Sequence, residues 1–191
     1  MLRHWLSACL FWCFGCAAAV AQTGLSPMLG VASSFGQSWY PDLLTSAEAI
    51  PVRTFRDEMY WERIEDLGQY QFTQFMTTYP HMIGAKGNEV SLLLSGGHPA
   101  YDGGHTPHSP EAVAAFGKMA AAVVARFPAI TSVEIGNEFN GQDFVTGPVR
   151  ATSSMDRAAR YMSLLKSSHA QVKSQNAATR VIGGAVLGIP V

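Results

Sequence analysis

The residues best suited to acid–base chemistry are an amide and a carboxylic acid that stand side by side after an apolar run. Residues 132–135 read Ser-Val-Glu-Ile, and Asn137 and Glu138 follow after one glycine. A carboxyl at the end of a buried strand can hold a proton and deliver it to a ligand as a general acid. Alternation along the strand turns Glu134 and Glu138 to one side and the apolar residues to the other. Glu138 is therefore a candidate general acid; alternatively, it caps the next loop or pairs with a surface cation.

Polar side chains also follow the two preceding apolar runs. Arg56 comes directly after residues 52–55, and His98 comes shortly after residues 90–94. The carboxyl ends of parallel strands in a barrel meet at one mouth, where catalytic side chains from several strands gather. We therefore expect Arg56 and His98 to face the same ligand as Glu138.

The loop 96–108 contains His98, His105 and His108 together with Asp102, a set that invites a metal interpretation. However, the loop is rich in glycine and proline and lacks a fixed ligand spacing, so the wall of a binding site is the better interpretation. We expect no metal ion and no cofactor.

The elements that must position these residues alternate between short apolar runs and longer amphipathic segments. The expected strands are Met28–Ala32, Val52–Phe55, Val90–Leu94, Ser132–Ile135 and Val181–Leu187. Ser109-Pro110-Glu111 is a helix start, and Ser153 or Ser154 caps a later helix. Pro80 should bend or split a helix between the second and third strands.

Strands that alternate with helices indicate an α/β fold with a parallel sheet. Two architectures compete, an open doubly wound sheet and a (β/α)8 TIM barrel. Residues 30–36 lack the glycine spacing of a phosphate loop, whereas polar residues at successive strand ends are typical of the barrel. A barrel usually takes about 250 residues. The sequence therefore predicts a (β/α)8 barrel that is truncated after its fifth strand.

Composition excludes several classes of protein. The chain has 191 residues, of which 48% are hydrophobic and 14% charged, with a formal net charge of −1. This balance is typical of a folded domain and excludes a disordered chain. Phosphate contacts need clustered Lys and Arg, so we expect no nucleic-acid partner.

Residues 1–21 have the layout of a secretory signal peptide. A short polar start precedes an apolar run, and Ala19-Val20-Ala21 is a small-residue cleavage site before Gln22. The run is shorter than a membrane-spanning helix requires, so we expect a secreted or periplasmic protein without a stable membrane span. A lipoprotein attached through Cys16 is the second choice. All three cysteines lie in this segment, which leaves residues 22–191 without a disulfide or thiolate chemistry.

A longer motif surrounds the arginine. It runs Arg-x4-Trp-x3-Glu-x2-Gly-x-Tyr-x-Phe, at Arg56, Trp61, Glu65, Gly68, Tyr70 and Phe72. With Asn137-Glu138, this motif resembles the retaining (β/α)8 glycoside hydrolases, most of all family 39 and related exopolysaccharide hydrolases, with families 5 and 42 close behind. The resemblance covers about residues 28–190 and implies that residues 22–191 are the N-terminal part of a catalytic domain.

The resemblance also implies roles for individual residues. Glu138 would be the acid/base, Asn137 would hold the 2-hydroxyl of a polysaccharide or oligosaccharide substrate, and Arg56 would orient the nucleophile. His98 could bond a sugar hydroxyl or Glu138. Trp39 and Tyr101 have flat apolar faces that suit stacking on sugar C–H groups, whereas Trp61 fits a core role.

One part of the family pattern is absent. Retaining glycosidases need two carboxyl groups about 5–5.5 Å apart. In the family that this sequence resembles, the nucleophile comes from the seventh strand. We expect Asp57 to be a loop or capping acid and Glu65 to be part of the structural motif around Trp61, so neither replaces it. The alternative function is therefore a non-catalytic carbohydrate-binding protein derived from a glycosidase barrel.

We predict cleavage after Ala21 on export, because the Ala-Val-Ala site precedes Gln22. Mass spectrometry of the exported protein should find Gln22, free or cyclised, at the N-terminus. A mature chain that begins at a lipid-modified Cys16 would instead establish the lipoprotein.

Overall fold

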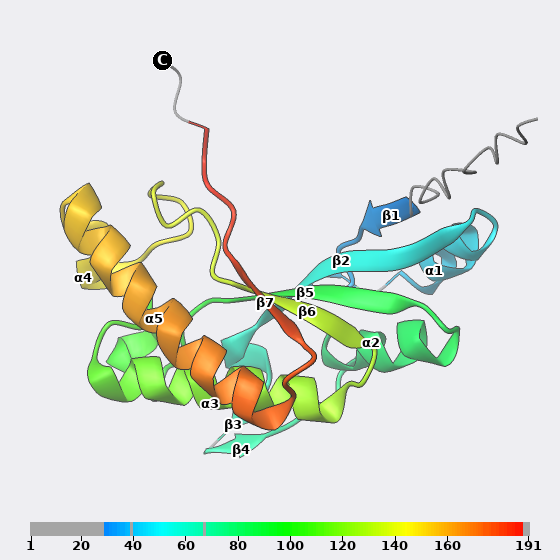
Figure 1. Ribbon diagram of the computed structural model, residues 1–191, viewed down its shortest axis with the longest axis horizontal. Coiled ribbons are helices and arrows are strands. Elements are labelled where there is room, and N and C mark those ends of the chain that lie inside the picture. The colour runs from blue at the N-terminus through cyan, green and yellow to red at the C-terminus, as the bar shows by residue number, and fades with distance from the viewer. Residues whose placement is uncertain (1–28, 39, 67, 189–191) are drawn as a thin grey trace, which may run out of the picture.

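The computed structural model describes residues 29–38, 40–66 and 68–188. The predicted signal peptide, residues 1–21, and Trp39 lie outside the described residues. In the described part, a five-stranded sheet has the order β1-β2-β5-β6-β7 with every neighbouring pair parallel (Figure 1). Its strands are β1 (Leu29–Ala32), β2 (Val52–Tyr60), β5 (Glu89–Ser95), β6 (Ile130–Ile135) and β7 (Arg180–Gly183). A two-stranded antiparallel hairpin is formed by β3 (Glu65–Asp66) and β4 (Gln69–Tyr70).

Helices connect the strands. They are α1 (Pro41–Glu48), α2 (Phe75–Ala85), α3 (Pro110–Arg126), α4 (Gly147–Arg150) and α5 (Ser154–Gln175), with short 3-10 turns η1 (Trp61–Arg63) and η2 (Asp102–Gly104). None of the helices in the described ranges combines the length and the apolar character needed to cross a bilayer.

The prediction of an α/β fold with five parallel strands in chain order is confirmed. The described residues do not form a closed barrel, in agreement with the prediction of a barrel truncated after its fifth strand. Within the described residues, β1 and β7 are the two edges of the sheet and do not pair with each other. Closure of eight strands requires each edge to meet a further strand, and the five strands described here form an open arc.

The second strand is longer than predicted. β2 continues to Tyr60, so Arg56 lies in the middle of the strand and not after it. The extension follows from the neighbouring strand, because β5 pairs with β2 from Thr54 through to Tyr60. A mixed run of charged and apolar residues can thus be a strand when one face is buried and the other is not.

The predicted helix starts are confirmed. Ser109 Oγ accepts from the amide of Ala112 at 3.1 Å, and Ser153 Oγ accepts from the amide of Asp156 at 3.1 Å. Each bond satisfies an amide of the first turn that has no partner within the helix. Pro80 does not split its helix, because α2 runs without interruption through it.

The buried face of α5 differs from the expected one. Helical spacing in the sequence predicts a buried face made of Met155, Ala158, Ala159, Met162, Leu165, His169 and Val172. In the structure, however, Met155 is 82% exposed and Met162 is 44% exposed. The buried side chains are those of Arg157, Leu164, Ser168 and Val172. This stripe packs on α3, where a Cβ at Gly117 would lie only 2.9 Å from Ser167 Oγ. Gly117 therefore lets the two helices approach closely beside Ser167, which an apolar pattern alone does not reveal.

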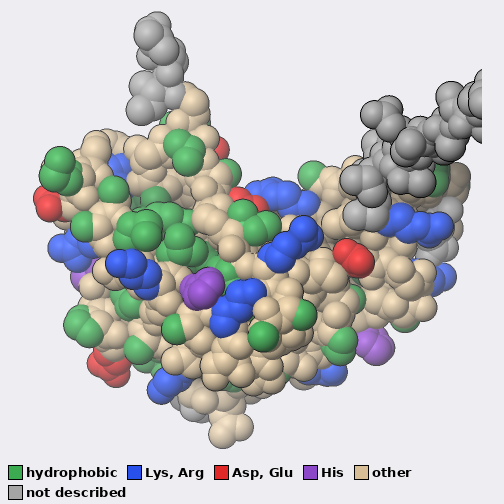
Figure 2. Space-filling view, in the orientation of Figure 1, with side chains coloured by type: hydrophobic (Ala, Val, Ile, Leu, Met, Phe, Trp, Pro, Cys, Tyr) green, Lys and Arg blue, Asp and Glu red, His purple; other side chains and the backbone are tan. Residues whose placement is uncertain are grey.

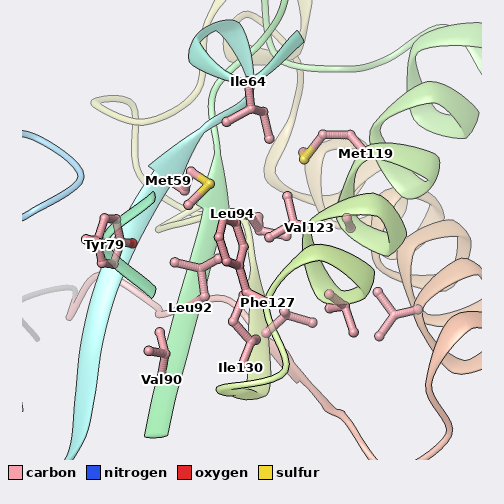
Figure 3. Close-up of a cluster of buried hydrophobic side chains, with 14 of the residues drawn as sticks. Met59, Ile64, Tyr79, Val90, Leu92, Leu94, Met119, Val123, Phe127 and Ile130 are labelled. Atoms are coloured by element: carbon pink, nitrogen blue, oxygen red, sulfur yellow. The ribbon is translucent and has the colours of Figure 1, made fainter. Parts of the chain in front are cut away.

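The core lies between one face of the sheet and the helices. Leu92 and Leu94 from β5 pack with Met59 from β2, and Met119 and Val123 from α3 cover them (Figure 3). These are alternate residues of each strand, as the period of two along a strand requires. The other alternate residues face away from the helices, and this second face of the sheet is where the polar side chains gather.

Asp57 fixes the loop after β1 to the sheet. Its 3%-exposed carboxylate accepts hydrogen bonds from Ser33 Oγ and the amides of Phe35, Gly36 and Glu58, at 2.5 to 3.1 Å. Its predicted role as a structural acid of this loop fits these bonds.

We expect Asp57→Asn to destabilise the protein by about 2–3 kcal/mol, because an amide nitrogen would then face backbone donors. Urea denaturation should show a lower midpoint with an unchanged slope. Asp66→Asn, at an exposed position on β3, serves as the control and should change the midpoint little. Equal stability of the two variants would contradict the role of Asp57.

Candidate functional site

The uncovered face of the sheet carries a row of charged groups. Glu58 on β2, Leu93 on β5 and Glu134 on β6 lie at one level, because they are register partners across the three strands. Arg56 lies two residues before Glu58 and therefore on the same face. The sheet thus offers both acceptors and donors to a polar ligand above it.

Glu134 is the most connected of these groups. Its Oε2 accepts from Arg56 Nε at 3.0 Å and from Arg56 Nη2 at 2.8 Å, and its Oε1 accepts from the amide of Ala185 at 2.9 Å. Glu134 is 7% exposed, whereas the Arg56 side chain is 46% exposed. About half of the Arg56 side chain therefore remains exposed, and its Nη1 makes no hydrogen bond among the described residues, whereas both oxygens of the Glu134 carboxylate have partners.

Glu58 is a site residue that the sequence reasoning missed. Its carboxylate accepts from Ser95 Oγ, from Tyr60 Oη at 2.7 Å and from Gln37 Nε2 at 3.3 Å. Burial, with the hydrogen bond to Glu58, raises the pKa of Tyr60 to about 12, so the phenol stays a donor at neutral pH. The signal was present in the alternation of Arg56, Glu58 and Tyr60, but it is legible only once β2 is known to extend this far.

The turn after β6 sets the direction of Glu138. Gly136 has φ 68° and Glu138 has φ 42°, so both lie in the left-handed region. A Cβ at Gly136 would lie 2.6 Å from the ring of Phe139, which makes glycine necessary there. The strain at Glu138 is held by two backbone bonds, from its amide to Ala185 O and from the amide of Gly141 to its carbonyl, both 2.8 Å. Such strained non-glycine residues cluster at functional sites.

Two side chains anchor this turn to the rest of the protein. Asn140 donates to Leu187 O at 2.8 Å and accepts from the amide of Leu187 at 2.9 Å, which ties the turn to the segment after β7. Arg157 of α5 is buried and donates to the carbonyl of Gly141. The backbone around Glu138 is therefore fixed from two sides.

Three of the predicted site residues meet in one open depression, here called the sheet hollow. Its lining includes Arg56, Asn137 and Glu138. The other lining residues are Ser33, Gln37, Asp57, Glu58, Leu93, Phe144 and Ala185. In Figure 2 the outline of the molecule dips between the part built on α5 and the part built on β1 and β2. Among the described residues, the side chains of Asn137 and Glu138 make no hydrogen bond, which leaves both available to a ligand.

His98 and Tyr101 lie in a separate cluster around Trp61. His98 is 7% exposed, its Nε2 bonds Glu65 O at 2.9 Å, and its Nδ1 accepts from the amide of Ala100. Tyr101 stacks on Trp61 and donates to Glu65 Oε1 at 3.2 Å. The structure does not bring His98 to Glu138, because both ring nitrogens are engaged here. Trp61, fully buried, has the predicted core role.

Asp102 shapes the loop between β5 and α3. Although burial opposes ionisation, hydrogen bonds from the amides of Ser109 and His108 outweigh it and lower the pKa of Asp102 below its ordinary value. The carboxylate accepts from these amides at 2.9 and 2.7 Å, and His108 Nδ1 lies 3.1 Å away. Within the described residues, no three His, Cys, Asp or Glu side chains group as a metal site would require.

The fold is similar to those of solved proteins. One is a family 39 glycoside hydrolase from the gut symbiont Bacteroides cellulosilyticus WH2, with a TM-score of 0.61 and 17% sequence identity. Another is the catalytic domain of CelCCA, with a TM-score of 0.52 and 13% identity. The matches cover 81% and 77% of this chain but only 31% and 43% of those chains.

At these identities the likeness concerns the fold. The sheet and its helices are similar in fold to part of each of these two proteins, so the predicted resemblance is confirmed as a likeness of fold. No family model matches the chain, and no curated protein matches it in sequence.

We expect the Arg56–Glu134 pair to be coupled in stability. In a double-mutant cycle of Arg56→Met and Glu134→Gln, the coupling free energy should be about 1 kcal/mol, since solvent screens the exposed guanidinium. Urea denaturation of the four proteins measures it. Additive effects of the two substitutions would mean that the pair contributes nothing to folding.

Proposed function

We propose that this protein is an exported glycoside hydrolase that cleaves O-glycosidic bonds of a polysaccharide or oligosaccharide, with Glu138 as acid/base. The observation that carries the proposal is the carboxyl of Glu138 itself. It stands without a protein hydrogen-bond partner among the described residues, on a strained turn at the carboxyl end of β6, in a fold similar to part of glycosidase barrels.

The neighbouring groups suit a sugar ring in the sheet hollow. Glu138 would donate its proton to the glycosidic oxygen as the bond to the anomeric carbon breaks, and would later take a proton from water. Asn137 would hold the 2-hydroxyl through its amide. The Nη1 group of Arg56 would donate to a further hydroxyl, and the carboxylate of Glu58 would accept from another.

A retaining reaction also needs a nucleophilic carboxylate about 5–5.5 Å from the acid/base. The other acids lining the hollow, Asp57 and Glu58, are each held by three or four donors, and nearby Glu134 is held by Arg56 and Ala185. We therefore propose that the nucleophile comes from strands beyond the five described here.

The lack of a free second carboxylate among these residues also favours a second candidate function. A protein that keeps the sugar-binding groups without a free second carboxylate would bind carbohydrate and not cleave it. The two candidates differ in whether the wild-type protein releases reducing ends from an oligosaccharide that it binds.

For the hydrolase, Glu138→Gln should slow cleavage of oligosaccharides by about 10²- to 10⁴-fold, because their leaving groups need a proton. Dinitrophenolate leaves without acid assistance, so the first chemical step with dinitrophenyl glycosides should slow by less than about tenfold. Steady-state release of reducing sugar measures the first rate, and the pre-steady-state burst of dinitrophenol measures the second, both with the full-length protein.

Glu62→Gln, at an exposed glutamate outside the sheet hollow, is the control and should leave both rates unchanged. Equal loss on both substrate types would contradict an acid role for Glu138. Binding of oligosaccharide with no cleavage by the wild type would select the carbohydrate-binding candidate.

A further inference from the structure

A second, more enclosed cavity lies directly beside the sheet hollow and is here called the side cavity. It is bounded by the turn after β6, the first turns of α5 and the segment after β7. Its lining residues are Glu138, Phe139, Asn140, Ser154, Ala158, Tyr161, Gly184, Ala185 and Val186. In Figure 2, hydrophobic side chains gather over this part of the molecule, where Figure 1 places α5.

The lining of the side cavity is mostly apolar, and the polar groups of Tyr161 and Asn140 in it already have hydrogen-bond partners. Phe139 and Tyr161 present their rings, with centroids 4.8 Å apart, and Ala158 and Val186 add aliphatic surface. The phenol of Tyr161 donates to Ile135 O at 3.0 Å and accepts from the amide of Gly184. Burial raises the pKa of Tyr161, so this donor is retained at neutral pH and is already used. Asn140 is likewise engaged by Leu187.

The size of the side cavity suits one ring. Its volume is about 160 Å³, and it is open to solvent on the side of Val186, so it has room for a single ring about the size of benzene. A cavity of this size with an apolar lining favours a flat, uncharged ring over a sugar. The hydroxyls of a sugar would find few free hydrogen-bond partners there.

Glu138 and Ala185 line both the sheet hollow and the side cavity, so they form the wall between the two. The acid of a glycosidase contacts the oxygen that joins the sugar to its leaving group. A sugar in the sheet hollow with its glycosidic oxygen at Glu138 would therefore have its leaving group beside the side cavity.

We propose that the side cavity binds an apolar, ring-sized leaving group, so that the preferred substrates are glycosides of aryl or similar apolar aglycones. This inference rests on the proposed function, because it places the scissile oxygen at Glu138. It assigns to Phe139, Ala158, Tyr161 and Val186 the recognition of the part of the substrate that departs.

The first test uses p-cresol, which is neutral at pH 7 and resembles such a leaving group. Saturation-transfer NMR with the full-length protein should show saturable binding. Ala158→Phe, which fills the cavity, should raise the Kd by more than about tenfold. Ala159→Phe adds the same ring at an exposed position outside the lining and should change the Kd by less than about twofold.

Val186→Ser provides a second variant at an exposed position, where folding is little affected, and should also weaken p-cresol binding. Far-UV circular dichroism and thermal melting check that each variant is folded. Binding that does not saturate, or that is the same in wild type, Ala158→Phe and Val186→Ser, would overturn the proposal.

A second measurement separates this inference from the proposed function. For any sugar that binds, the phenyl glycoside should bind at least about tenfold more tightly than the methyl glycoside, and Ala158→Phe should remove that advantage. Methyl and phenyl glycosides that bind equally would overturn the inference and leave the proposed function intact. If p-cresol binds and no glycoside does, the proposed function fails, and the role of the cavity in leaving-group recognition fails with it.

Discussion

The carboxylate of Glu134 is the constraint on which the site depends. It is almost fully buried, and a buried charge is tolerated only with partners for its oxygens. Arg56 satisfies one oxygen across two strands, and the amide of Ala185 satisfies the other. The carbonyl of Ala185 then receives the amide of Glu138. The salt bridge on the uncovered face of the sheet thus helps to fix the backbone of the candidate acid, because Ala185 bonds both Glu134 and Glu138.

The two faces of the sheet divide stability from chemistry. Alternate residues such as Phe55, Met59 and Val133 bury their side chains against the helices and form the core. The intervening residues on the same strands carry the charges that line the sheet hollow. Because the period of a strand is two, neighbouring residues of one strand belong to different faces, one to the core and the other to the side of the sheet hollow. Asp57 is an exception, since it lines the hollow and is also the acid that fixes the loop after β1.

Glu138 joins two environments of opposite character. On one side the hollow offers carboxylate, guanidinium and amide groups, and on the other the side cavity offers rings and aliphatic groups. In the reaction proposed above, Glu138 would transfer a proton between a sugar and its leaving group, and each part of the substrate would find its own kind of surface. The left-handed backbone of Glu138 is the local cost of placing it there.

The sequence by itself determined the α/β class, the five parallel strands, the capped helices and the place of Asn137 and Glu138 at the end of β6. These features depend on periodicity, capping residues and strand order, which are local and legible in one chain. It did not determine the length of β2, the buried face of α5 or the separation of His98 from Glu138. Each of these was decided by a partner far away in the chain: the pairing of β5, the close approach of α3 at Gly117, and the carbonyl of Glu65. A sequence offers several possible partners for each of these groups, and only the packed tertiary structure determines which partner each group contacts.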